Sequence, residues 1–152
     1  MRLINLTAIV AFSAFPVIAS ADDATENAME ARHGLMKMFA VDMGLLSGMA
    51  KGEIEYDEAA ASRAASNIEA LGAYDPSGLF LEGTAVGEVD DSEALPAIWE
   101  NPEDFAQKFA DLGEAAIGAG DAVKGGRENL GPVLQKLGGT CKACHDDYRQ
   151  KD

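Results

Sequence analysis

Three residues close to the end of the chain, Cys141, Cys144 and His145, form its most specific chemical pattern. They make up a C-x-x-C-H motif, whose spacing suits covalent haem attachment. On a helix, positions i, i+3 and i+4 lie on one face. The two cysteines can therefore form thioethers with the haem vinyl groups while His145 points its imidazole at the iron. The motif predicts one haem c, bound through Cys141 and Cys144, with His145 as an axial ligand.

A C-x-x-C pair also occurs in redox-active dithiols and in zinc sites. A structural zinc site needs four Cys or His ligands, but outside the motif the chain has no further Cys and only His33. A thioredoxin-like dithiol is expected at the start of a helix in a βαβ unit, where the helix dipole lowers the thiol pKa. Here the motif falls near the end of the last expected helix, without strands around it, which favours haem.

The beginning of the chain has the pattern of a cleaved export signal. Arg2 gives a positive start, residues 3–19 are mostly apolar, and a small-x-small cleavage site ends at Ala21. A membrane anchor is the alternative, but polar residues and a proline interrupt the apolar run, and acidic residues follow it directly. We therefore expect residues 1–21 to be removed on export to the periplasm, and residues 22–152 to form a cytochrome domain with no stable membrane anchor.

The composition fits a single acidic domain. The expected mature chain of 131 residues is large enough to bury one core. The full sequence has a formal net charge of −14 at pH 7, and loss of Arg2 with the signal brings it to about −15. Such a surface disfavours nucleic acid and anionic lipid and would steer charged partners. Solubility of an exported protein explains the acidity equally well.

The apolar periodicity is helical throughout, and strand signals are nearly absent. Asp57 can cap one helix, and Asn101 followed by Pro102 is a strong start for another. Pro132 means that the last helix either kinks or begins there. The pattern predicts an all-α, antiparallel four-helix bundle. The expected helices cover about residues 23–50, 57–71, 101 to 118–120, and 127–150.

The connection at residues 73–100 is long, acidic and contains Pro and Gly. Long loops are often functional, but a plain crossover between the second and third helices is a sufficient explanation for this one. We expect Trp99 to fill the core where the crossover meets the bundle, rather than to act as a redox relay.

The motif in its context resembles the class II c-type cytochromes, the cytochrome c prime family. The resemblance rests on the string GGTCKACHDDYR at residues 138–149 and on a single C-terminal motif in the last helix of a four-helix bundle. It extends over the mature chain, with Arg32 four residues before Met36 and an Ala-Ile-Trp segment at residues 97–99. Cytochrome c prime is itself a standard example of such a bundle.

The resemblance implies two functions, which differ at the sixth iron position. In the high-spin branch that position is empty, a bulky apolar residue four positions after the first-helix arginine shields it, and the protein binds gases such as nitric oxide. In the low-spin branch a methionine at that position ligates the iron, and the protein looks like an electron carrier. In this chain the position is Met36. Some high-spin members nevertheless carry an unbound methionine there.

Without the resemblance, the residues leave several candidates for a sixth ligand. A methionine stripe is more often adaptable core packing than a ligand set. His33 lies about 100° around the helix from Arg32, and we expect it at the margin of the core. Peroxidase-like catalysis would need acid or base groups beside an open iron position. The sequence offers only His33 for that role, which is weak support. The candidates are His33, Met29, Met36, Met38, Met43 and Met49, of which Met29, Met36 and Met43 recur every seven residues on one stripe.

The resemblance favours Met36, because the spacing from Met36 to Leu46 and to residues 50–57 is closer to the low-spin branch. We therefore expect a periplasmic electron carrier, not an enzyme, with His145 and Met36 as axial ligands and redox proteins as partners. Arg32, like its family counterpart, is expected to offset a haem propionate. The alternative is a five-coordinate cytochrome binding nitric oxide or carbon monoxide. Family members are often dimeric, so a homodimer stays open.

Overall fold

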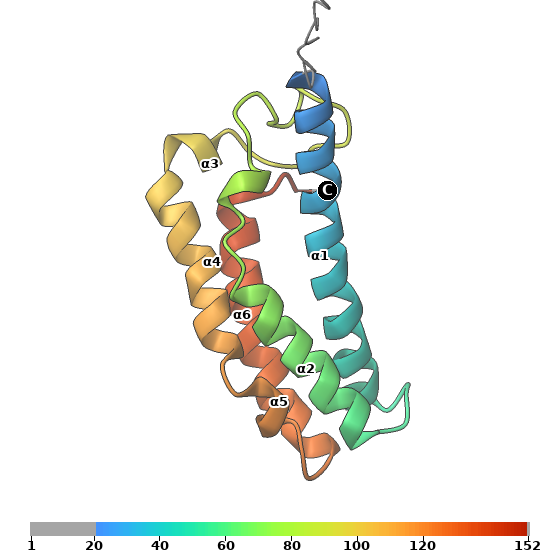
Figure 1. Ribbon diagram of the computed structural model, residues 1–152. Helices are drawn as coiled ribbons and strands as arrows, with labels where there is room; N and C mark the ends of the chain where they lie inside the picture. Colours follow the sequence, from blue (N-terminus) through green and yellow to red (C-terminus); the bar gives the residue numbers. More distant parts are fainter. Residues whose placement is uncertain (1–20, 152) are drawn as a thin grey trace, which may run out of the picture.

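Four long helices form an antiparallel bundle in the computed structural model, which describes residues 21–151. Figure 1 shows successive long helices running in opposite directions, as the sequence predicted. The described residues contain two isolated β-bridge pairs and no strand. The long helices are α1 (Ala21–Lys51), α2 (Glu58–Gly72), α4 (Pro102–Ala116) and α6 (Leu130–Tyr148). The short ones are α3 (Ala97–Glu100), α5 (Ala119–Ala122) and the 3₁₀ turns η1 (Ser77–Leu79) and η2 (Arg127–Asn129).

The expected export signal lies, except for Ala21, outside the described residues. Among the helices of the described part, none is both long enough and apolar enough to cross a membrane.

Two predicted helix starts are confirmed. The Asp57 carboxylate accepts a hydrogen bond from the Ala60 amide at 2.8 Å and caps α2. In α4, Pro102 is the first helical residue, although the Asn101 side chain makes no capping bond. Pro132 lies in the first turn of α6, where its missing N–H costs nothing. The last helix therefore begins near Pro132.

Two predicted helix ends are wrong. The third helix stops at Ala116, because Gly118 takes a left-handed conformation with φ 72° and the chain turns before α5. The last helix ends at Tyr148, so that Arg149 and Lys151 lie beyond its final turn instead of within it. Both errors come from turns whose backbone geometry helical periodicity does not encode.

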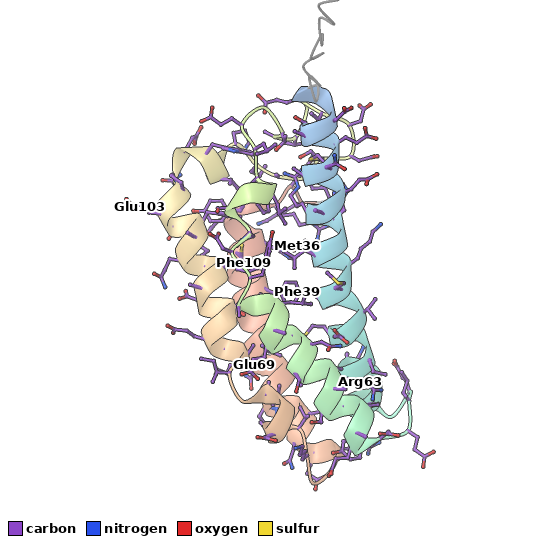
Figure 2. All side chains as sticks on the ribbon, in the orientation of Figure 1. Met36, Phe39, Arg63, Glu69, Glu103 and Phe109 are labelled. Atoms are coloured by element: carbon purple, nitrogen blue, oxygen red, sulfur yellow. The ribbon has the colours of Figure 1, made fainter. Side chains whose placement is uncertain are left out.

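The core has one large and one small part. In the large part, Phe39 of α1 meets Phe109 of α4 edge to face, with ring centroids 6.2 Å apart; both are labelled in Figure 2. The small part contains Ala94, Ile98, Phe105 and Tyr148 and lies where the crossover meets α4 and α6. Trp99 packs against it and donates its indole N–H to the Phe80 carbonyl at 3.0 Å. Trp99 is thus the expected plug of the core.

Helices α2 and α4 approach most closely at Gly72 and Gly113. A Cβ added to Gly113 would lie 2.6 Å from the Gly72 carbonyl oxygen, which is backbone and cannot move alone. We expect Gly113→Ala to lower the free energy of unfolding by about 1–3 kcal/mol, as overpacking does. The matched control is Gly44→Ala in α1, where a Cβ meets nothing within 4 Å. Urea denaturation of both variants measures the difference, and equal stability would contradict the close approach.

Candidate functional site

The C-x-x-C-H motif lies in the C-terminal half of α6, and its three side chains share the face turned toward the bundle. Cys141 packs against the large part of the core and Cys144 against the small part, and both thiols are half-buried. Gly138 and Gly139 precede them, and a Cβ on either glycine would meet nothing within 4 Å. The predicted placement of the motif on a helix is therefore correct, and the adjoining helix surface is open.

The environment of the two thiols does not suit a redox dithiol. Burial raises the pKa of Cys141, and it raises the pKa of Cys144 to about 11. A reactive dithiol needs the opposite shift, because the thiolate is the nucleophile. Within residues 21–151, no group of three or more His, Cys, Asp or Glu side chains could hold a metal ion. The zinc interpretation therefore lacks ligands there, and covalent haem attachment remains.

His145 is exposed at the edge of this face. Partial desolvation by the neighbouring protein is the main influence on its imidazole, and lowers the pKa of His145 below its ordinary value. Lower basicity favours the neutral imidazole, which is the form that ligates metals. His145 is therefore suited to the predicted role of axial ligand.

An apolar cavity of about 440 Å³ opens beside the motif, between α1, the crossover, α4 and α6. Its volume falls within the range of about 300–1,000 Å³ that is usual for ligand and cofactor pockets. The apolar wall and the adjacent Cys144 and His145 fit a flat, mostly apolar macrocycle tethered to α6. The wall is formed mainly by Met36, Phe80, Ile98, Phe105 and Phe109.

Met36 comes to this cavity from α1, whereas Cys144 comes from α6. Figure 2 shows it on the side of α1 that faces the interior of the bundle. Of the six methionines, Met36 alone lines the cavity within the described residues. Met49 is buried in the large core, Met43 packs against it, and Met38 is 49% exposed. The structure thus narrows the methionine candidates to Met36, whereas His33 also lines the cavity.

Arg32 also lines the cavity, but its side chain is only 4% exposed. Its guanidinium donates to the Thr84 hydroxyl at 3.3 Å, to the Ser92 hydroxyl at 3.1 Å, and to the Met29 sulfur. It also lies 5.0 Å from the centroid of the Phe80 ring. These partners include no carboxylate, so Arg32 is not part of an ordinary surface salt bridge. Burial lowers the pKa of Arg32.

A buried cation is costly unless it is paired or hydrogen-bonded. The hydroxyls of Thr84 and Ser92 satisfy the Arg32 N–H groups without neutralising their charge. The site therefore retains a positive charge beside the cavity, which would suit an anionic group of a bound cofactor. The propionate role of Arg32 remains a prediction.

Sequence reasoning missed Tyr148, which lines the cavity three residues after His145. Its hydroxyl donates to the Asp104 carboxylate at 2.5 Å, and its ring packs edge to face on Phe105 at 5.4 Å. Burial, followed by Asp104, raises the pKa of Tyr148 to about 12. A helical spacing of i+3 from His145 could have indicated the shared face. The contact with Asp104, 44 residues away, has no local signal.

Lys142, between the two cysteines, points outward as expected. Its side chain is 74% exposed and pairs with Asp146 one turn later. Exposed pairs of this kind contribute little to stability. Lys142 therefore marks the solvent side of the motif and is not part of the cavity.

A helical bundle with a C-x-x-C-H motif beside an apolar cavity is a c-type haem protein. The sequence profile described as Cytochrome C' matches residues 27–149. The chain belongs to the cytochrome c′ family, the class II c-type cytochromes. Like its relatives, it carries one covalently attached haem c.

Several proteins show the range of the similarity. The chain is 47% identical over 139 residues to cytochrome c-554 of Cereibacter sphaeroides. The matched region covers 91% of this chain and 91% of that one. The solved cytochrome c′ of Rhodobacter sphaeroides superposes with a TM-score of 0.78 at 41% identity and covers 84% of this chain and 98% of that one. A nitric oxide complex of a cytochrome c prime mutant from Alcaligenes xylosoxidans superposes with a TM-score of 0.68 at 29% identity. It covers 84% of this chain and 97% of that one.

Proposed function

We propose that this monohaem cytochrome carries single electrons, with the haem joined to Cys141 and Cys144 and with His145 and Met36 as axial ligands. The observation that supports Met36 is its position in the lining of the cavity that Cys144 and His145 enter from α6. It is the only thioether in that lining within the described residues. Both the residue type of Met36 and its position in the cavity lining thus favour it as the sixth ligand of the iron.

The haem supplies a one-electron iron couple at this site. As an iron ligand beside His145, the soft thioether of Met36 would favour the ferrous state and raise the reduction potential. Phe80, Ile98 and Phe105 form a dry wall, which lowers the local dielectric and tunes the potential further. None of these residues transfers a proton to a substrate, and we propose no enzymatic turnover.

The remaining parts of the proposal concern the surroundings of the site. Arg32 would offset a haem propionate, since its charge has no carboxylate partner among its hydrogen bonds. The redox partners would be proteins that dock near the exposed Lys142. The export signal that we expect at residues 1–21 would deliver the chain to the periplasm.

Gas binding is the second candidate function, and the names of the relatives favour it over His/Met ligation. Solved structures similar to this chain include cytochromes c′ of several bacteria, and one is described as a nitric oxide complex. If Met36 lies in the cavity without binding, the same wall would admit a small apolar gas. Nitric oxide or carbon monoxide would then bind at the sixth position.

A homodimer is a further part of the proposal. A cytochrome c′ that is 28% identical to this chain is described as having ligand-controlled dimer dissociation. In the present chain, Met38 and Val41 expose apolar side chains on the outer side of α1. Such residues could take part in an interface between two copies.

The optical spectrum of the purified holoprotein in both oxidation states tests the ligation. We expect a low-spin spectrum with a far-red methionine-to-ferric band, and no shift at a carbon monoxide concentration that saturates Met36→Ala. In Met36→Ala the band should disappear and carbon monoxide should bind, because the sixth position opens. Met43→Ala is the matched control, since Met43 lies on the same stripe but outside the cavity lining. A high-spin wild-type spectrum that shifts readily with carbon monoxide would reject Met36 ligation and establish the gas-binding candidate.

A further inference from the structure

The crossover between α2 and α3 touches both helices that carry the proposed iron ligands. We call residues 84–95 the strap. One part of the strap is bound by Arg32, which lies one helical turn before Met36 in α1. Its other end pairs with residues 148–150, which begin just after His145 at the end of α6. Figure 1 shows the crossover passing over the end of the bundle where these helices lie.

The contact with α1 is buried and specific. Thr84 is 1% exposed and Ser92 is 7% exposed, and both hydroxyls accept from the Arg32 guanidinium. Each hydroxyl also donates to the backbone: Ser92 to the Thr84 carbonyl at 2.7 Å, and Thr84 to the Leu81 carbonyl at 2.7 Å. Both are therefore fixed as donor and acceptor, and hydrogen bonds to a charged group are stronger than neutral ones.

The contact with α6 joins backbone to backbone. The Leu95 amide donates to the Tyr148 carbonyl at 3.0 Å, and the Gln150 amide donates to the Glu93 carbonyl at 2.8 Å. The Arg149 guanidinium donates to the Glu93 carboxylate at 2.7 Å. The Arg149 amide in turn closes the helix on the His145 carbonyl at 3.2 Å. The strap is thus anchored one turn from the proposed proximal ligand.

The strap is also braced internally, so that its two anchors are not independent. The Val86 amide donates to the Ala94 carbonyl at 2.8 Å, which closes the loop on itself. The Glu88 carboxylate accepts from the Ala85 amide at 2.9 Å, and the Glu88 amide donates to the Ala85 carbonyl at 3.0 Å. A displacement at one anchor would therefore reach the other, since the loop between them is short and hydrogen-bonded.

We propose that the strap sets the spacing between α1 and α6 at the cavity and so holds Met36 at the sixth coordination position. Thr84, Ser92 and Glu93 are the positioning residues, and none of them need touch the iron. This proposal rests on the proposed function, because it assigns a role to the distance between Met36 and His145. On α1, Arg32 lies one helical turn before Met36, and residues at i and i+4 share a face. At the other anchor, Arg149 and Gln150 directly follow the last turn of α6, which contains His145.

Ser92→Ala and Glu93→Gln test the two anchors separately. Ser92→Ala removes the acceptor of one Arg32 N–H, and Glu93→Gln removes the charge opposite Arg149. The matched control is Ser62→Ala, because Ser62 also joins two segments through its hydroxyl, donating to the Gly120 carbonyl at 2.7 Å between α2 and α5. That contact lies at the opposite end of the bundle (Figure 1).

In the holoprotein, three quantities are measured: the far-red methionine band, the affinity of the ferrous form for carbon monoxide, and amide exchange at Leu95 and Gln150. We expect each anchor variant to weaken the band and to raise carbon monoxide affinity about tenfold, the effect of losing one hydrogen bond to a charged group. Exchange at the two amides should accelerate in Glu93→Gln, and Ser62→Ala should match wild type in all three.

Two outcomes would overturn the proposed role of the strap. If the anchor variants match Ser62→Ala in the band and in carbon monoxide affinity, the strap does not position Met36. Amide exchange at Leu95 and Gln150 that is already fast in the wild type would show that the α6 anchor does not persist in solution. A wild type without the methionine band would instead reject Met36 ligation and, with it, this role of the strap, whereas the first two outcomes overturn the strap alone.

Discussion

Replacing both Cys141 and Cys144 with serine should abolish covalent haem attachment completely. Serine keeps nearly the same volume, but its hydroxyl does not form the thioether that a cysteine sulfur makes with a vinyl group. Haem staining after denaturing electrophoresis should be lost, and the intact mass should fall to that of the polypeptide. Haem would also no longer fill the cavity of about 440 Å³, so the bundle should unfold at lower temperature.

Controls separate the attachment from general damage at the motif. Lys142→Ala, between the two cysteines, removes an exposed side chain and should leave the haem attached. Each single serine variant should keep one thioether and therefore retain stain. Full covalent haem in the double variant would contradict the assignment of these two residues.

The largest expected effect on stability is that of Leu46→Ala. Leu46 lies in α1 with 0% of its surface exposed, in the large part of the core. Removal of its buried methyl groups leaves a cavity, and such substitutions lower the free energy of unfolding by about 2–5 kcal/mol. Urea denaturation of the holoprotein, followed by circular dichroism, measures this change.

Ile117→Ala is the control for Leu46→Ala, because it shortens an apolar side chain between α4 and α5 that is 70% exposed. It should change the free energy of unfolding by less than about 0.5 kcal/mol, as surface substitutions usually do. Similar losses in the two variants would show that Leu46 is not part of a tightly packed core.

The helices were predictable to the extent that their signals are local. Asp57 caps α2 through a bond to Ala60, three residues away, and Pro102 begins α4, as expected. The end of α4 was misplaced because Gly118 takes a left-handed conformation, and a glycine in a sequence permits this conformation without requiring it. Helix periodicity therefore located the elements but not the turns between them.

The site divides in the same way. Cys141, Cys144 and His145 are recognised together because their spacing is that of one helix face. Thr84, Ser92 and Glu93 have no such spacing, and each meets its partner across more than fifty residues of sequence. Arg32 was expected to offset a haem propionate, but its burial and its bonds to Thr84 and Ser92 were not predictable from the sequence.

Haem attachment was thus predictable from the sequence by itself. A thiol, a second thiol three residues later and an adjacent imidazole indicate haem attachment, and the lack of further cysteines and of strand patterns around them disfavours a zinc site or a redox dithiol. Which of the sixth-ligand candidates lie at the cavity required the fold, because a distance across the bundle is a property of packed helices; His33 and Met36 both line it. Only packing shows that Met36 lines the cavity while Met43 packs against the core, since both lie on the same stripe of α1.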